Sequence, residues 1–232
     1  MQFEISKVIN FQIFKLTNFQ IRQMELSVLN IQGKETGKKV TLSDEIFGIE
    51  PNEHVVWLDV KQYLANQRQG THKSKERAEV SRSTRKLKKQ KGTGGARAGS
   101  AKSPLMKGGG RIFGPRPRDY SFKLNKKVKS LARQSAFAAK AQGGNVTILE
   151  NFSFDSPKTK SYIALLDALS LAGKKTLLIL PEDNKNVYLS GRNLPKTTIG
   201  TAGQVNTYDL VNATQLLIVE EAISTIESSF SK

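Results

Sequence analysis

The basic segment at residues 68–140 is the feature that most limits how this chain can fold. It holds 22 lysines and arginines against 3 acidic residues, a net charge of +19, whereas the rest of the 232-residue chain holds 15 basic and 17 acidic residues. Between residues 68 and 118 lie nine of the 18 glycines and one aromatic residue, Phe113. Such a segment cannot bury enough apolar surface to offset the entropy of ordering it.

This concentration of positive charge predicts a polyanionic partner, and nucleic acid is the dense polyanion of the cell interior. A structureless connection of about 50 residues inside a compact domain either argues against the assignment of elements or marks a functional loop, and here the charge supplies the function. We therefore expect the segment to be disordered by itself and to become ordered only against a partner that neutralises it.

The remainder of the chain has the pattern of one α/β domain. Short apolar strands alternate with helices, and the strand TLLIL at 176–180 is apolar on both faces, which is typical of a parallel sheet covered by helices on each side. We expect a three-layer domain made of residues 24–67 and 125–232, with 68–124 as an extended basic loop. Expected strands are 25–31, 39–42, 146–149, 176–180, 197–199 and 215–219, and expected helices are 44–47, 53–67, 125–142, 157–172, 184–193, 208–211 and 220–229. The expected buried stripe of the helix at 53–67 is Val55, Val56, Leu58, Val60, Tyr63 and Leu64. The helix at 125–142 is expected to end at Gly143-Gly144 and to pack closely through Val128, Leu131, Ala132, Ser135, Ala136 and Ala139.

Several classes of protein are disfavoured by composition. The chain has no cysteine, which excludes disulfides and thiolate metal sites, and its two histidines, His54 and His72, are far apart. We expect no cofactor, no metal and no small-molecule substrate. Residues 1–23 have neither a membrane-length apolar run nor a signal-peptide pattern, so we interpret Met24 as the natural start, with an amphipathic anchor helix as the rival interpretation.

The run RSTRKLKKQKGTGGAR at 82–97 is the motif that points most specifically to nucleic-acid binding. Lysine and arginine at near-alternate positions can reach phosphates on several sides, and glycines let the backbone turn tightly or approach a nucleotide. A solvated linker or localisation tract is the plain alternative. The prolines and aromatics of GGGRIFGPRPRDY, which follows, favour RNA contact instead.

Other motifs have structural interpretations. Gly92-Thr93-Gly94-Gly95 does not follow a strand, so it is not a dinucleotide-binding turn. The acidic pairs Glu182-Asp183 and Glu220-Glu221 suit helix N-termini better than acid–base catalysis. Trp57 is expected to be core or half-buried, not a stacking platform.

With these residues in view, the chain resembles the bacterial large-subunit ribosomal protein L-four family from Met24 to about Phe230. The resemblance rests on Arg68-Gln69-Gly70-Thr71, Arg77-Ala78-Glu79-Val80, Gln90-Lys91-Gly92-Thr93-Gly94, Gly108-Gly109-Gly110 and Gly114-Pro115-Arg116-Pro117-Arg118-Asp119-Tyr120. Where that family often has Pro-Trp before the loop tip, this chain has Leu87-Lys88. Where the family often has Arg after Gly-Thr-Gly, this chain has Gly95.

The resemblance implies a cytoplasmic, ribosome-bound, non-enzymatic protein that binds large-subunit ribosomal RNA early in assembly. It also implies neighbouring ribosomal proteins as partners, one of which contributes a second loop to the peptide exit tunnel. The loop tip would be Lys89, Gln90, Lys91, Gly92, Thr93, Gly94, Gly95 and Arg97. The expected RNA-binding residues are Arg68, Lys73, Arg77, Arg82, Arg85, Lys86, Lys88, Lys89, Lys91, Arg97, Lys102, Lys107, Arg111, Arg116, Arg118, Lys126, Lys127 and Arg133.

Two alternatives remain open. One is an enzyme acting on RNA or nucleotides at the carboxyl edge of the sheet, for which the sequence supplies no catalytic constellation. The other is a free RNA-binding regulator of its own messenger RNA, which differs from a ribosomal protein in where the protein resides.

Overall fold

The computed structural model describes residues 24–230 and divides them into two compact units. The first unit contains the described residues up to Tyr63 together with those from Leu124 onward, and the second unit is Leu64–Lys123. The expectations for residues 1–23 lie outside the described residues.

The first unit is built on one six-stranded sheet with the strand order β2-β1-β3-β6-β4-β5. Strand β2 pairs antiparallel with β1, and every other pairing is parallel. The expected parallel sheet is therefore confirmed, with an antiparallel ribbon added at one edge. The strands are β1 (Met24–Leu29), β2 (Glu35–Leu42), β3 (Val146–Leu149), β4 (Thr176–Leu180), β5 (Thr197–Thr201) and β6 (Gln215–Val219).

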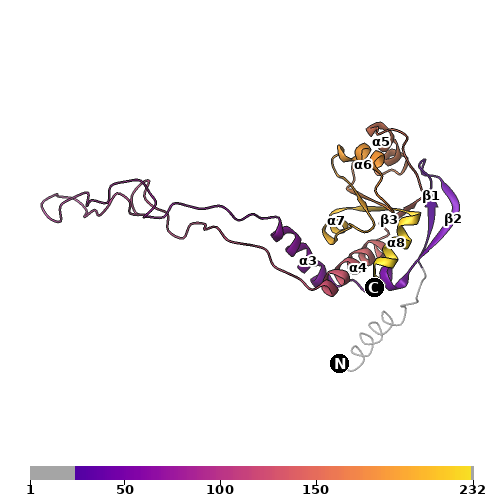
Figure 1. The fold of residues 1–232 in the computed structure, drawn as a ribbon, viewed down its shortest axis with the longest axis horizontal. Coiled ribbons are helices and arrows are strands. Elements are labelled where there is room, and N and C mark those ends of the chain that lie inside the picture. The colour runs from indigo at the N-terminus through magenta and orange to yellow at the C-terminus, as the bar shows by residue number, and fades with distance from the viewer. Residues whose placement is uncertain (1–23, 231–232) are drawn as a thin grey trace, which may run out of the picture. The chain divides into compact units, whose positions relative to one another are not determined.

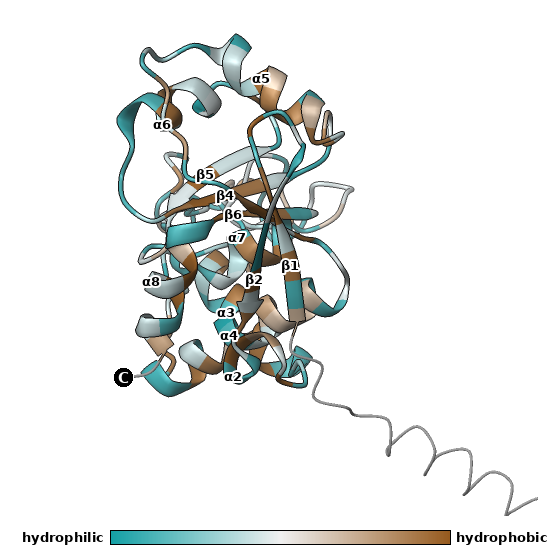
Figure 2. Ribbon diagram, turned by 90° about the vertical axis from the view of Figure 1, so that its right-hand side faces the viewer, coloured by the Kyte–Doolittle hydropathy of each residue, from teal (hydrophilic) through white to brown (hydrophobic). Residues whose placement is uncertain are grey.

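Helices cover both faces of this sheet. Helices α5 and α6 lie on one side, and α2, α4, α7 and α8 lie on the other (Figures 1 and 2). The predicted three-layer α/β class is thus observed. The helix bounds are α2 (Asp44–Phe47), α3 (Glu53–Asn66), α4 (Lys126–Gln142), α5 (Thr159–Ala168), α6 (Lys185–Arg192), α7 (Thr207–Asn212) and α8 (Glu220–Phe230).

The core lies where the central strands meet these helices, and the brown strands of Figure 2 mark it. All five residues of β4 are buried, as its continuous apolar sequence predicts. Helix α4 approaches closely because Ala132 and Ala138 are fully buried and small. Phe137 of the same helix makes an edge contact with Phe47, with ring centroids 5.7 Å apart, and a second edge contact with Phe230 at 6.3 Å.

Two details of the helices differ from expectation. Helix α5 begins at Thr159 and not at Pro157, because Lys158 is still extended and the Asn186 side chain donates to the Phe154 carbonyl oxygen at 2.8 Å. This bond holds the chain ahead of the helix in a non-helical path. At the far end, Ala168 is the last helical residue, so the helix ends before Gly173.

Helix α3 has a different buried face from the one predicted. Gln62 is its buried residue, Asp59 accepts a 2.5 Å hydrogen bond from the Thr207 hydroxyl, and Tyr63 stacks on Tyr208 at 4.9 Å. Trp57 points elsewhere and is 54% exposed, stacked on His54. The expectation that Trp57 is core or half-buried is therefore wrong, because polar and aromatic contacts of the opposite face position the helix.

Candidate nucleic-acid interface

The second unit follows α3 and precedes α4 in the sequence, and it consists of two arms that run side by side (Figure 1). The first arm lies before the predicted tip at residues 89–97 and the second arm lies after it. Within this unit the two arms are joined by sparse backbone hydrogen bonds instead of a continuous ladder. The cross-arm bonds are Arg118 N to Gly70 O (3.1 Å), Ser74 N to Pro115 O (3.1 Å), Arg111 N to Lys75 O (2.9 Å) and Leu87 N to Gly99 O (2.9 Å). Most backbone polar groups of the arms thus remain available to solvent or to a partner.

Glycines stand where one arm touches the other. A Cβ atom on Gly70 would lie 2.0 Å from the Arg118 carbonyl oxygen, and one on Gly110 would lie 2.4 Å from the Arg77 nitrogen. A Cβ on Gly114 would meet the Ser74 hydroxyl at 1.8 Å. These separations are far below van der Waals contact, so the arms can approach each other only because these positions lack a side chain.

Two acidic residues of the first arm hold basic residues of the loop. Glu76 pairs with Arg116 on the other arm at 2.5 Å, and Glu79 pairs with Lys73. The hydrogen bond from Lys73, supported by the Glu76 backbone N–H, lowers the pKa of Glu79 from its ordinary value. Both carboxylates are therefore engaged inside the loop, and neither stands alone to repel a polyanion.

Tyr120 organises two arginines at the base of the loop. The Arg68 guanidinium lies 3.7 Å from the ring centroid and the Arg118 guanidinium 4.4 Å from it. Hydrogen bonding and charge from Arg118, with added charge from Arg68, lower the pKa of the Tyr120 hydroxyl. A guanidinium has five N–H donors, so donors remain for phosphate on both arginines, and the tyrosine positions two predicted RNA-binding residues.

The far part of the loop carries cations without acidic partners. Within the described residues, Lys88, Lys89 and Lys91 form no ion pair, and all three are exposed. Gly92 and Gly94 adopt φ angles of 79° and 61°, which turn the backbone in a region that disfavours residues with a Cβ. The chain at the predicted tip is thus a tight, positively charged turn.

Known proteins resemble this chain over most of its length. The model of the Ribosomal protein L4/L1 family matches residues 40–229. The chain is 65% identical over 205 residues to "Large ribosomal subunit protein uL4" of Cytophaga hutchinsonii, which covers 88% of this chain and 99% of that protein. It is 63% identical over 209 residues to the protein of the same name from Flavobacterium psychrophilum, covering 90% and 100%. The chain belongs to the ribosomal protein L4/L1 family.

Membership of this family of ribosomal proteins confirms the expectation that the chain is not an enzyme. The carboxyl ends of β4 and β6 do border a cavity of about 380 Å³ lined by residues such as Asn151, Pro181, Asp183 and Glu221. Asn184 caps α6 there by accepting from the Asn186 and Val187 N–H groups. Among the described residues, no three histidine or acidic side chains are grouped as a metal site, and no helix is both long and apolar enough to cross a bilayer.

The structure divides the predicted RNA-binding residues between the two units. Lys126, Lys127 and Arg133 belong to α4 in the first unit, and the other fifteen belong to Leu64–Lys123. In the second unit, the Arg82 guanidinium donates a hydrogen bond to the Lys107 carbonyl oxygen at 2.7 Å, so part of this side chain is used within the protein. Arg133 lies over the Phe230 ring at 5.4 Å. The remaining members are exposed except Lys102, which is half-buried.

The departures from the family pattern have local consequences in the second unit. Leu87 is 52% exposed, and its backbone N–H bonds Gly99 on the other arm. A Cβ on Gly95 would lie 3.3 Å from the Lys88 ammonium. This chain therefore places a lysine where the family often presents an aromatic residue, close to a glycine where the family often presents an arginine.

Sequence reasoning missed one organising residue and several cations. The sequence predicts Tyr120 only as one of the aromatics of GGGRIFGPRPRDY, although its position two residues after Arg118 is a signal for a contact between the ring and a guanidinium group. The exposed Lys75 and Lys123 were omitted from the predicted set. Lys174, Lys175 and Lys196 of the first unit were also omitted, because nothing in their local sequence indicates that they lie together.

Proposed function

We propose that this chain is a structural, rRNA-binding constituent of the large ribosomal subunit, ribosome-bound in the cytoplasm and added early in assembly. The proposal rests on the second unit, which carries 17 lysines and arginines against 3 acidic residues with few internal ion pairs. The names of the curated relatives, all large ribosomal subunit proteins, support the same assignment.

In this proposal the loop neutralises phosphates where rRNA helices crowd. Extended arms with exposed cations on several sides suit a site surrounded by RNA, since they bring many charges into contact with little protein volume. Recognition then depends on the folded shape of the RNA and on its backbone, and less on base edges. Residues 89–97 form the tip that narrows the peptide exit tunnel beside a loop of a second ribosomal protein.

Salt dependence tests the binding mode. If the loop makes about ten phosphate contacts, log K for a large-subunit rRNA fragment falls with log salt at a slope of roughly −7 to −9. The native protein should also co-sediment with large subunits on a sucrose gradient. A slope near −2 contradicts loop-dominated binding, and a protein found only in ribosome-free fractions favours the free messenger-RNA regulator.

A substitution at the tip provides a second test of the proposed function. Lys91→Glu should leave subunits assembled but alter the response to drugs that bind in the exit tunnel. Lys34→Glu, the same charge change on an exposed lysine between β1 and β2, is the matched control. Unchanged drug response with normal assembly would show that the tip does not lie in the tunnel.

A further inference from the structure

The amino-terminal edge of the sheet gathers lysines from three separate parts of the first unit. Lys175 immediately precedes β4, and Lys196 immediately precedes β5, which pairs with β4 from its first residue. Lys140 reaches this edge from α4, where its ammonium donates to the Ala213 carbonyl oxygen, two residues before β6, at 2.5 Å. Lys174, which precedes Lys175 in the chain and is exposed like Lys175 and Lys196, is the fourth lysine near this edge.

Hydrogen bonds to neutral oxygens hold these side chains in place. The Lys175 ammonium donates to the Asn212 side-chain oxygen at 2.8 Å, and the Lys196 ammonium donates to the Gly173 carbonyl oxygen at 3.1 Å. A lysine ammonium has three donors, so each of them keeps donors for a further partner. These bonds fix the position of the charge without neutralising it.

No carboxylate compensates this edge within the described residues. Asp167 and Asp209 belong to the helices that lead into it, yet neither forms an ion pair with the four lysines. Burial lowers the pKa of Lys140 and raises that of Asp209, which is the direction expected when neither group has an opposite charge in contact. The positive charge of the edge is therefore unpaired.

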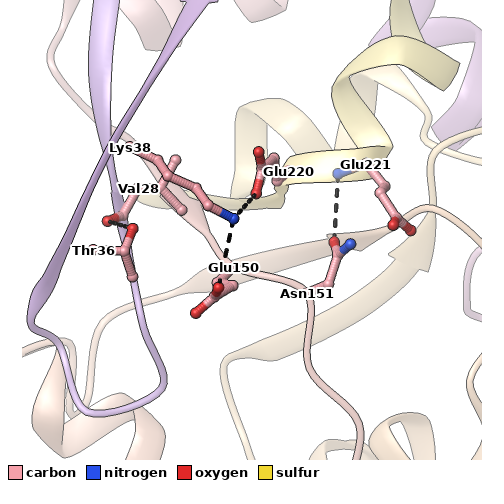
Figure 3. Close-up of polar contacts among 7 residues, drawn as sticks. All are labelled: Val28, Thr36, Lys38, Glu150, Asn151, Glu220 and Glu221. Carbon is pink, nitrogen blue, oxygen red and sulfur yellow. Dashed lines mark hydrogen bonds and ion pairs between the residues drawn. The ribbon is translucent and has the colours of Figure 1, made fainter.

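The opposite edge of the same sheet is arranged differently. Acidic residues follow β3, β4 and β6 at their carboxyl ends: Glu150, Glu182, Asp183, Glu220 and Glu221. Figure 3 shows Lys38 lying between Glu150 and Glu220, with ammonium–oxygen distances of 3.7 and 3.8 Å. A lysine at the carboxyl edge is thus shared by two carboxylates, whereas the amino edge has lysines and no paired acid.

The backbone conformation of Lys196 is a second, independent observation that points to a function of this edge. Lys196 has a φ of 69°, in the left-handed region that residues with a Cβ rarely adopt. Its carbonyl oxygen accepts from Thr176 N–H at 2.9 Å, which joins the beginnings of β4 and β5. Strained backbone of this kind is often retained where it places a functional group.

We propose that Lys174, Lys175 and Lys196 at the amino edge of the sheet form a second RNA-backbone-binding surface, on the folded unit itself and separate from the basic loop. This inference rests on the proposed rRNA-binding function. The ligand chemistry is a run of phosphates, because unpaired ammonium groups on adjacent strands, which lie about 4.8 Å apart, can contact successive phosphodiesters. The surface anchors the unit on RNA by charge and carries no base specificity.

The test measures rRNA-fragment affinity against salt for the full chain. Replacing the three lysines with glutamine should reduce the slope of log K against log salt by about 2 to 3 and weaken binding about 50-fold at 0.15 M salt. Replacing the same three lysines with glutamate should weaken rRNA binding further. Lys34→Glu, at the opposite edge, should leave the slope nearly unchanged, and the melting temperature of each variant shows whether the fold is retained.

The outcomes separate this inference from the function on which it rests. Strong salt-dependent binding by the native chain, with no change in the folded glutamine variant, overturns the second surface and leaves the proposed function intact. Unchanged RNA affinity with poorer incorporation into large subunits also overturns it, since the edge then contacts an acidic protein. Absence of rRNA binding by the native chain overturns both.

Discussion

At the scale of single residues, the loop depends on positions that have no side chain. Gly70, Gly110 and Gly114 allow two arms to touch, while the Tyr120 ring lies within 4.4 Å of the guanidinium carbons of two arginines. The sequence predicts that Gly92, Gly94 and Gly95 let the chain turn tightly or approach a nucleotide. Gly70, Gly110 and Gly114 have a different, internal role, because a Cβ at these three sites collides with the opposite arm before any RNA is present.

Gly110→Ala tests this role at one site. The new Cβ would lie 2.4 Å from the Arg77 nitrogen, so the arms must separate and the Arg111–Lys75 backbone bond must lengthen. We expect roughly tenfold weaker rRNA binding with an unchanged melting temperature, because the first unit has its own core. Gly99→Ala is the control, since no atom lies within 4 Å of its Cβ position. Equal affinities for the two variants would contradict a steric role.

At the scale of elements, α4 illustrates how a helix serves both packing and charge. Lys126 and Lys127 begin it on exposed positions, and Gly143 and Gly144 end it as predicted. Its buried face is Ala132, Ser135, Ala136, Phe137, Ala138 and Ala141, whereas the sequence interpretation included Ala139 and omitted Phe137. Small residues were expected to give close packing, but the direction of that face is determined by the sheet and by the neighbouring Phe47 and Phe230 rings.

Two adjacent alanines of α4 provide a matched stability test. Ala138 is fully buried and Ala139 is exposed. Ala138→Leu should lower the free energy of unfolding by about 1–3 kcal/mol through overpacking. Ala139→Leu should change it by less than about 0.5 kcal/mol. Chemical denaturation of both variants measures the difference, and similar values for the two would place the buried face elsewhere.

At the scale of the whole molecule, the hydrophobic core and the excess positive charge lie in different parts of the chain. The hydrophobic core belongs to the first unit, while the second unit has a net charge of +14 from 17 basic and 3 acidic residues. The sequence predicts a domain of residues 24–67 and 125–232 and a loop of residues 68–124 that orders only against a polyanion. Both statements stay predictions.

Removal of the loop tests the division directly. The Arg118 N–H donates to the Gly70 carbonyl oxygen at 3.1 Å, so the two arms begin side by side and a short Gly-Ser linker can replace residues 70–118. The shortened chain should remain soluble and melt cooperatively, because the sheet and its helices keep their core. Its rRNA affinity should fall by several orders of magnitude. Loss of cooperative melting would show that the loop belongs to the core.

Sequence alone determined the strand and helix order, the α/β class and the family, because these follow from local periodicity and ordered motifs. It determined β3, β4 and β6 to the residue, since buried parallel strands are uninterrupted apolar runs. Tertiary structure alone decided which side chains meet across long separations. It exposed Trp57, brought Lys140, Lys175 and Lys196 to one sheet edge, and set Gly110 against Arg77, because contacts between distant residues depend on packing that no local pattern encodes.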